Sequence, residues 1–543
     1  MSRIALIARA GNTWARALLQ NLRRARPTHE YDLFEVAGFC SSEADHDSEL
    51  SCIYIPSLTD KEGTKPDLSE AERVFQQSAR IRARNFILLS SALIYGTGPA
   101  RKSLVTEDYS ARGFGTGQIC SRWKALEAAA VRLLKANVPL TILRPATVLP
   151  SPTLLSRRLM RRLIVTMPGH DPVLQLLSLA DLAEAALCSV ERDQSGIFNV
   201  APDGVVPLRA AVRIVRSLCV PFPRTLQRFT MNSEALEYLR YPWTISNARI
   251  KAELGFAPRK SSVAALVECR NSSDPAPPAE PAFDEFGMDA NYIRSYTKTL
   301  FKFLCNYYWR IEAIGLEHVP RKGPGILVGM HRGFMPWDGV MALHQLVEKT
   351  GRIPRFLTHP GLLKFPFICN FIRKLGGVVA CQESAARVLE SGELLGVFPE
   401  GVQGAFTPYR RAYKLQRFGR DDFVKMALRY RAPIVPFVTI GSAEIFPIFA
   451  QIKSRCWTRY SDWPCLPVST FPFLPVPLPS KWHTQFLPPI HVEEQFPPEA
   501  AQDASVVKRI SVEVRTKMQQ AVDDMLRRRR SIFFGSVFDS EEG

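Results

Sequence analysis

The residues best able to do chemistry are a histidine and an aspartate separated by six positions, His331 and Asp338. The short apolar run 326–328 before them predicts a buried strand. Pro336 suits the first turn of a helix, and the apolar-periodic residues that follow predict that helix. A loop bent at Gly333 could bring the carboxylate of Asp338 back onto the imidazole of His331.

This pair suits proton abstraction from a hydroxyl group. A neutral histidine accepts the proton, while a carboxylate fixes the tautomer of the ring and stabilises the imidazolium that forms. A lone histidine before a helix is more often structural, so the interpretation needs support from other parts of the chain.

A second candidate position is Glu400, within GVFPEG at residues 396–401. It closes an otherwise apolar run, which places it at the end of a predicted strand, where functional side chains are commonly displayed. A third apolar run, 432–444, contains Pro433 and Pro436.

Four blocks in this half of the chain resemble the glycerolipid acyltransferase family: GMHRGFMPWD, the region 361–385, GVFPEG and APIVPFVTIGSAE. The resemblance covers roughly residues 295–535 and implies transfer of a fatty acyl group to a glycerol-type hydroxyl. It makes His331 the base and Asp338 its orienting partner, and it assigns Arg332, Glu400 and Gly401 to substrate binding. The donor would be acyl-CoA or acyl-carrier protein, with no metal or cofactor required.

One departure from the family pattern bears on the acceptor. The common pattern has four residues between the histidine and the aspartate, and this sequence has six. A subgroup similar to monoacylglycerol acyltransferases carries such a longer spacer with glycine and proline, and it also resembles this chain around residues 413–430. The departure therefore concerns which acceptor is used, a lysophospholipid or an acylglycerol.

Composition and charge indicate a multidomain protein with an anionic partner. The chain has 543 residues, 46% of them hydrophobic, and a net charge of +18, so two or three domains are expected. Neither zinc-type Cys/His spacing nor a nucleic-acid motif occurs, which favours an anionic membrane surface over nucleic acid. A basic soluble enzyme is the alternative.

Compartment and membrane topology follow from what the sequence lacks. Its 11 cysteines are scattered without paired spacing, which favours reduced thiols. The first 20 residues contain no apolar core of a secretory signal, and no run of about 18 apolar residues predicts a spanning helix. We therefore expect a cytoplasmic protein, peripheral on the inner face of the membrane.

The first half alternates predicted strands and helices, which indicates an α/β fold with a Rossmann-like doubly wound parallel sheet. Strands are expected at 3–9, 34–39, 52–58, 85–96 and 139–149, and helices at 14–24, 69–84 and 120–137. Several blocks across residues 3–268, including SSALIYG, LRPATVL and GIFNVAPDG, resemble the extended short-chain dehydrogenase/reductase family, in its NAD-dependent epimerase and dehydratase branch.

The catalytic positions of that family are incomplete here. Ser91 and Lys124 match its serine and lysine, but Cys120 stands where its tyrosine acid/base should be. Of the three phosphate-loop glycines only Gly11 is kept, because Ala8 and Trp14 replace the others, and no acidic residue is expected at the end of the 34–39 strand. Three interpretations of this domain remain: a non-catalytic module, an NAD(P) binder without turnover, or an active NAD(P)-dependent epimerase or reductase beside the acyltransferase.

The chain is thus expected to contain a dehydrogenase-like domain at 1–270, a Pro/Ala-rich linker at 271–288 and a separate α/β acyltransferase domain at 289–543. In the last of these, 289–315 predicts a helix that lies on lipid or packs in the core, and 383–395 predicts another helix. The basic run 409–420 could bind a phosphate, the prolines of 456–486 predict no regular sheet, and 505–530 predicts a closing helix that ends in RRRR.

Overall fold

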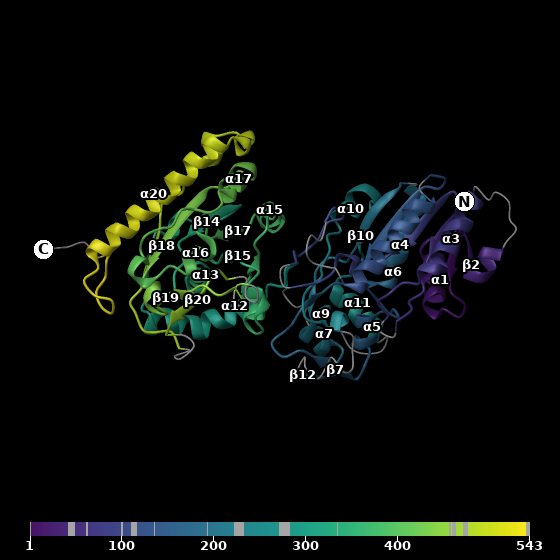
Figure 1. The fold of residues 1–543 in the computed structure, drawn as a ribbon, viewed down its shortest axis with the longest axis horizontal. Helices are drawn as coiled ribbons and strands as arrows, with labels where there is room; N and C mark the ends of the chain where they lie inside the picture. Colours follow the sequence, from purple (N-terminus) through teal and green to yellow (C-terminus); the bar gives the residue numbers. More distant parts are fainter. Residues whose placement is uncertain are drawn as a thin grey trace. The chain divides into compact units, whose positions relative to one another are not determined.

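The computed structural model divides the chain into two compact units, Met1–Gly287 and Met288–Gly543 (Figure 1). It describes residues 2–41, 49–60, 63–98, 101–109, 117–134, 136–192, 194–221, 233–270, 283–333, 335–455, 458, 463–470 and 476–538. Most of the predicted linker, residues 271–282, lies outside the described residues.

The N-terminal unit is built on a six-stranded sheet in the order β10-β5-β4-β3-β1-β2, and every neighbouring pair is parallel. Its central strands β3, β4 and β5 are buried throughout, as expected for strands covered on both faces. The strands are β1 (Arg3–Ala8), β2 (Glu30–Glu35), β3 (Leu50–Tyr54), β4 (Asn85–Leu89), β5 (Leu140–Pro145) and β10 (Gly196–Val200).

Helices cover both faces of this sheet. α1 (Thr13–Ala25) packs with α6 (Leu179–Arg192), and α3 (Leu68–Arg80) packs with α4 (Gln118–Leu134). Alternate residues of β1 enter the two cores: Ile4 joins the cluster of α1 and α6, whereas Ala5 joins that of α3 and α4. The prediction of a doubly wound parallel sheet is confirmed.

The predicted strand at 34–39 is wrong over most of its length. β2 ends at Glu35, where its pairing with β1 ends opposite Ala8, and α2 (Val36–Ser41) follows directly. Val36 and Phe39 are buried and three positions apart, a spacing that places both on one side of a helix. As a result an acidic residue, Glu35, does stand at the carboxyl end of β2, contrary to the expectation from the sequence.

The C-terminal unit contains a separate seven-stranded sheet in the order β13-β21-β18-β14-β17-β15-β16. Its neighbours are parallel except β18 and β21. The strands are β13 (Glu312–Ile314), β14 (Gly325–Gly329), β15 (Pro354–Thr358), β16 (Val378–Val379), β17 (Leu394–Val397), β18 (Ile434–Ile440) and β21 (His483–Phe486).

Four helices frame this sheet: α13 (Trp337–Thr350), α15 (Gln382–Glu390), α17 (Asp422–Arg429) and α20 (Ala504–Arg528). Ala342 and Leu346 of α13 pack in one core cluster with Leu327, Val435 and Phe437 of the central strands. α20 packs on β18 and on α17 (Figure 1). The expectation of a second, separate α/β domain is therefore met.

Three predicted elements of this unit need correction. The helix at 289–315 runs only from α12 (Ala290–Tyr296) through two π-helical turns to Tyr308, and β13 follows. The helix at 383–395 ends at Glu390, before β17. The proline-rich segment 456–486 contains β21 and also β20 (Leu466–Ser469), which pairs with β19 (Ile448–Ile452), because its prolines lie mostly outside the paired positions.

Within the described ranges, none of the helices is both long and apolar enough to traverse a bilayer.

Candidate active site

The loop between β14 and α13 brings His331 and Asp338 together. Gly333 has φ +79°, and a Cβ at that position would lie 2.5 Å from the carbonyl oxygen of Ser442. Only glycine adopts this conformation and tolerates so close a neighbour without strain. α13 then begins at Trp337, so that Asp338 lies in its first turn.

Asp338 holds the imidazole of His331 in one orientation. Its Oδ2 lies 2.9 Å from His331 Nδ1 and accepts a hydrogen bond of 2.7 Å from the backbone N–H of Arg332. The Asp338 side chain is fully buried, whereas that of His331 remains 12% exposed. Because a carboxylate requires a donor, Nδ1 carries the hydrogen and Nε2 is left as the basic nitrogen.

Arg332 and Glu400 were assigned to substrate binding from the sequence, but the structure pairs them with each other. Arg332 Nη1 and Nη2 donate to the two carboxylate oxygens of Glu400 over 2.8 and 2.9 Å, and the side chains are 1% and 0% exposed. Glu400 also accepts from the backbone N–H of Gln416 over 2.6 Å.

The remaining donors of Arg332 are used as well. Nε donates to the carbonyl of Ala412, Nη1 to that of His331 over 2.7 Å and Nη2 to that of Lys414 over 3.2 Å. Such a saturated guanidinium has no hydrogen left for a ligand. In this structure the pair therefore positions the backbone of His331. Glu400 also lines the same cavity as His331, and the assignment of Arg332 and Glu400 to substrate binding stays a prediction.

Gly401, the third residue assigned to substrate binding, begins the short helix α16 (Gly401–Ala405) with φ +60°. No atom lies within 4 Å of the position that a Cβ would occupy. It lines the same cavity as His331.

That cavity has a volume of about 740 Å³ and extends from His331 between α13, β15, β17, α16 and α17. Ligand pockets in proteins are typically roughly 300–1,000 Å³ in volume and mostly apolar. Its lining is largely aliphatic and aromatic, and includes Leu343, Phe356, Leu395, Val397, Phe406, Met426 and Trp463. His359 and Arg420 are among its polar lining residues, so that an apolar chain and a polar group could both be held near His331.

In the basic run 409–420, the cations Arg410, Arg411, Lys414, Arg417 and Arg420 are exposed, whereas Tyr413 has a structural role. Tyr413 donates from its hydroxyl to Glu444 over 2.5 Å, and Arg529 donates to the other oxygen of that carboxylate over 2.5 Å. Burial and the negative charge of Glu444 raise the pKa of the Tyr413 phenol well above its usual range. Arg420 lines the cavity, and it is the cation of this run best placed to meet a phosphate. Glu444 closes the block 432–444 of the family resemblance, but the sequence assigned no role to it and did not link Arg529 to the site.

In the N-terminal unit the residues expected to be vestiges of a cofactor site have local partners. The hydroxyl oxygen of Ser91 accepts from the backbone N–H of Leu93 over 3.2 Å. The Cys120 thiol donates to the carbonyl of Ile94 over 2.7 Å. Burial raises the pKa of this thiol, and the neighbouring Lys124 opposes the shift.

The phosphate-loop region combines kept and altered features. Gly11 has φ +72° and open space beside it, as a turn close to a ligand requires. The indole of Trp14 donates to the carbonyl of Pro150 over 2.7 Å, at the end of the sheet where doubly wound folds bind dinucleotides. Glu35 stands beside Ala8 in the register.

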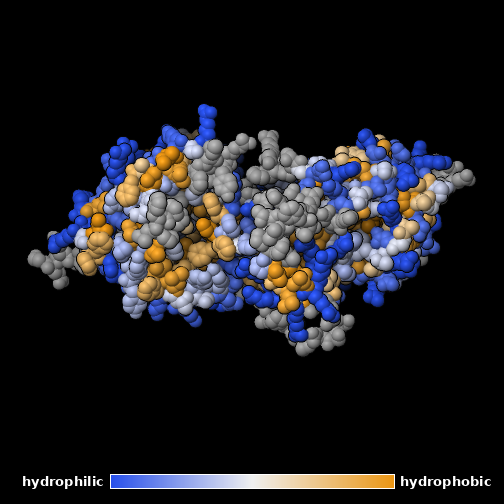
Figure 2. Space-filling view, turned by 60° about the horizontal axis from the view of Figure 1, so that its bottom comes forward, coloured by the Kyte–Doolittle hydropathy of each residue, from blue (hydrophilic) through white to orange (hydrophobic). Residues whose placement is uncertain are grey.

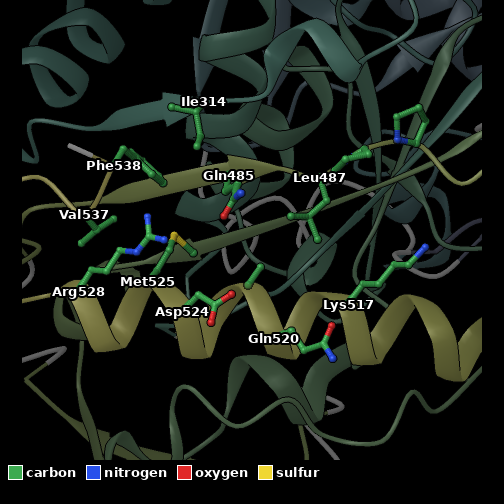
Figure 3. Close-up of a pocket in the computed structure, with 13 residues that line it drawn as sticks. Ile314, Gln485, Leu487, Lys517, Gln520, Asp524, Met525, Arg528, Val537 and Phe538 are labelled. Carbon is green, nitrogen blue, oxygen red and sulfur yellow. The ribbon is translucent and has the colours of Figure 1, made fainter. Parts of the chain in front are cut away.

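Two other features of the C-terminal unit have some of the properties of a binding site. Among the described residues, His491, Glu493 and Glu494 could together hold a cation, but His491 is already paired with Glu493 over 2.8 Å. A second hollow of about 420 Å³ lies between α20 and strands β13 and β21 (Figure 3). It shares no lining residue with the cavity at His331, and Lys517, Asp524 and Arg528 of α20 line it.

Comparison with known proteins identifies the C-terminal unit. The family model described as Acyltransferase matches residues 310–440, which contain His331, Arg332, Asp338, Glu400 and Gly401. An uncharacterized protein of Mycobacterium tuberculosis is 38% identical over 262 residues, which make up 46% of this chain and 72% of that protein. The chain belongs to the acyltransferase family.

Two further similarities concern this acyltransferase. A Bos taurus protein named DGAT1/2-independent enzyme synthesizing storage lipids is 26% identical over 152 residues, 28% of this chain and 43% of that protein. The solved structure of a human epimerase family protein, SDR39U1 with NADPH, is 17% identical with a TM-score of 0.40, and covers 50% of this chain and 100% of that chain.

Proposed function

We propose that this acyltransferase moves a fatty acyl group from a thioester, acyl-CoA or acyl-carrier protein, to the hydroxyl of a glycerolipid acceptor, a lysophospholipid or an acylglycerol. The observation that carries the proposal is the position of His331: Nδ1 is held by buried Asp338, and the ring lines an apolar cavity. The product would be of the class made in phospholipid and acylglycerol biosynthesis.

The chemistry follows from this geometry. His331 Nε2 takes the proton of the acceptor hydroxyl as its oxygen attacks the thioester carbonyl carbon, and a C–O bond forms. Asp338 stabilises the imidazolium. The tetrahedral intermediate collapses with cleavage of the C–S bond, and the imidazolium returns the proton to the thiolate. The products are an ester and a free thiol, and no metal, redox partner or enzyme-bound acyl group takes part.

The cavity suits the apolar part of such substrates. Its aliphatic and aromatic lining begins beside His331, as a fatty chain attached to the reacting carbonyl would require. Arg420 and His359 offer polar contacts within the same space, and the guanidinium fits a phosphate of the donor or of a lysophospholipid. The Bos taurus relative, named as synthesizing storage lipids, supports a lipid acceptor.

The alternative, in which the N-terminal unit is an active NAD(P)-dependent epimerase or reductase, lacks its acid/base. Cys120 replaces the phenol, and its thiol is engaged by Ile94. Gly11 and Glu35 are compatible with nucleotide contact. Because the phenol is replaced, however, we propose that this unit is a folded module without dehydrogenase turnover and not a second enzyme.

The test is incubation of the intact chain with labelled acyl-CoA or acyl-carrier protein and a panel of lysophospholipid, acylglycerol and glycerol phosphate acceptors, followed by lipid analysis. We expect ester product with the wild type and a loss of about 10²–10⁴-fold in turnover for His331→Ala. His491→Ala, outside the cavity, is the matched control. Near-normal turnover by folded His331→Ala protein would reject the mechanism.

A further inference from the structure

One face of the helix at 290–308 exposes large apolar side chains. Leu300, Phe303 and Tyr307 are exposed, Tyr307 by 70%, and the ring of Phe303 stacks with that of Tyr307. The opposite face of the helix is buried in the core through Ile293 and Phe301, among others. One face of this helix is therefore packed in the core, and the opposite, exposed face is also apolar. A helix whose outer face met only water would carry polar residues on that face.

The segment after α20 adds three more apolar side chains to this surface. Ile532, Phe533 and Phe534 are exposed, Phe534 by 73%. Arg310 fixes them beside the helix: it donates to the carbonyl of Phe533 over 2.9 Å, and its guanidinium lies 5.8 Å from the centre of the Phe534 ring. We call the six residues Leu300, Phe303, Tyr307, Ile532, Phe533 and Phe534 the aromatic patch.

Cations accompany both parts of the aromatic patch. Arg294, Lys298 and Lys302 are exposed on the helix, and residues 290–311 contain no acidic residue. Residues 525–534 likewise contain no acid, and they carry Arg527, Arg528, Arg529 and Arg530, of which Arg529 is buried against Glu444. Aromatic residues bordered by cations are the composition of surfaces that enter the headgroup region of anionic bilayers.

We propose that the aromatic patch is the surface by which the C-terminal unit docks on an anionic membrane. Figure 2, which brings the lower side of Figure 1 forward, shows hydrophobic residues reaching the surface of this unit. No spanning helix was found among the described residues, so the contact is interfacial. The positive net charge of the chain, +18, matches an anionic lipid surface.

The patch lies directly behind the cavity. Phe301 and Leu304, on the inner face of the same helix, share a core cluster with Val340, Leu343 and Leu375, and these three residues line the cavity. Docking would therefore place the bilayer against the outer face of a helix whose inner face packs on the wall of the cavity. The use of this surface for lipid substrates rests on the proposed function, whereas the docking itself does not.

The test is sedimentation of the intact chain with vesicles of equal parts phosphatidylcholine and phosphatidylserine, and with vesicles of phosphatidylcholine alone. We expect binding to the first that weakens as salt rises, and little binding to the second. Lys298→Gln/Lys302→Gln should bind about 30-fold more weakly, because each cation near an anionic surface contributes on the order of a fivefold factor. Phe303→Ser/Phe534→Ser should lose binding.

Leu218→Ser is the matched control, since Leu218 is 72% exposed in the N-terminal unit. It should bind as the wild type does. Equal binding by Phe303→Ser/Phe534→Ser, equal binding to both vesicle types, or none to either would overturn the proposal. Acyl transfer to a water-soluble acceptor distinguishes the docking proposal from the proposed function. The docking variants should retain this transfer. If the wild type binds vesicles but shows no such transfer, the result would count against the proposed function alone.

Discussion

At the scale of single residues, the orientation of one imidazole ring decides whether this site can act. The imidazole of His331 is hydrogen-bonded to Asp338, and the aspartate is also held by the backbone N–H of Arg332. The imidazole of His331 is therefore oriented by the Asp338 carboxylate, which is in turn held in place by the backbone. A base arranged in this way loses no free energy to reorientation during the proton transfer.

Asp338→Asn should keep the shape of this arrangement and lose its function. An amide can offer a hydrogen to Nδ1, which favours the wrong tautomer, and it cannot stabilise the imidazolium. We expect turnover to fall by about two orders of magnitude or more with little change in KM. The check is steady-state kinetics, and the double variant with His331→Ala should be no slower than His331→Ala alone. Additive losses would contradict a shared role.

The pair Arg332 and Glu400 predicts a specific pattern of stability. Glu400→Gln leaves a buried guanidinium without its countercharge, so the free energy of unfolding should fall by about 3–5 kcal/mol. Arg332→Met/Glu400→Leu removes both charges and should lose less than either single change. Urea unfolding followed by circular dichroism measures this. Arg249→Gln, which breaks an exposed ion pair with Glu253, is the control and should cost at most about 1 kcal/mol.

Some of these residue roles could be predicted from the sequence and others could not. The strand, the glycine and the helix start around His331 are local signals, and they indicated the contact with Asp338. The partner of Glu400 lies 68 positions away, at Arg332, and no local pattern specifies such a pairing. Both were assigned to substrate binding through the family resemblance, which does not distinguish a charge that meets a substrate from a charge that meets a buried partner.

At the scale of elements, two buried histidines link the stability of the C-terminal unit to pH. His344 on α13 and His483 on β21 are both fully buried, and burial lowers the pKa of each. In the unfolded chain they regain an ordinary pKa of about 6.5. Below that pH the unfolded state therefore binds more protons than the folded state, and stability falls as pH falls.

We expect the urea midpoint of this unit to decrease between about pH 7.5 and pH 5.5, the range around the unperturbed histidine pKa. His344→Leu should reduce the slope of that decrease, because one group that titrates only on unfolding is removed. Unfolding curves at several pH values provide the measurement. A midpoint that is constant or that rises toward pH 5.5 would contradict the prediction.

Element boundaries were harder to predict than element types. Apolar continuity indicated β1, β4, β5, β14 and β18, because each is buried on both faces. The end of β2 was missed, since Val36 and Phe39 fit a strand by residue type and a helix by spacing. Likewise, residues 312–314 were predicted to continue the preceding helix. They form β13 instead, because they pair with β21, which lies more than 160 positions further along the sequence.

At the scale of the whole molecule, the acyltransferase unit is joined to an N-terminal unit with a doubly wound parallel sheet, in which Cys120 stands where the dehydrogenase family that the sequence resembles has a tyrosine. We predict that the intact chain neither oxidises nor reduces an NAD(P) cofactor and binds none tightly. Cys120 cannot replace the phenol, because burial raises the pKa of its thiol and its hydrogen is given to Ile94. Calorimetry with NAD⁺, NADH, NADP⁺ and NADPH is the measurement.

A micromolar Kd for any of the four would contradict the binding half of this prediction, and it would make Gly11 and Glu35 the first residues to substitute. The sequence supported two units of these fold classes because strand–helix alternation is a property of each segment. The sequence could not predict the cavity, because residues from several helices and from the strands β15 and β17 line it, and only tertiary packing brings these elements together.

The contacts that support the candidate active site extend well past the part of the chain that carries His331 and Asp338. The carbonyls of Ala412 and Lys414 accept from Arg332. Between and beside them, Gln519 of α20 donates to the carbonyl of Tyr413 over 3.0 Å and accepts from the backbone N–H of Leu415 over 2.8 Å. Arg529 secures Glu444 beside the Tyr413 hydroxyl. The backbone that holds His331 is thus braced by a helix that begins at Ala504, outside the family match at 310–440. An autonomous catalytic fragment of this protein would have to include that brace, through Arg529.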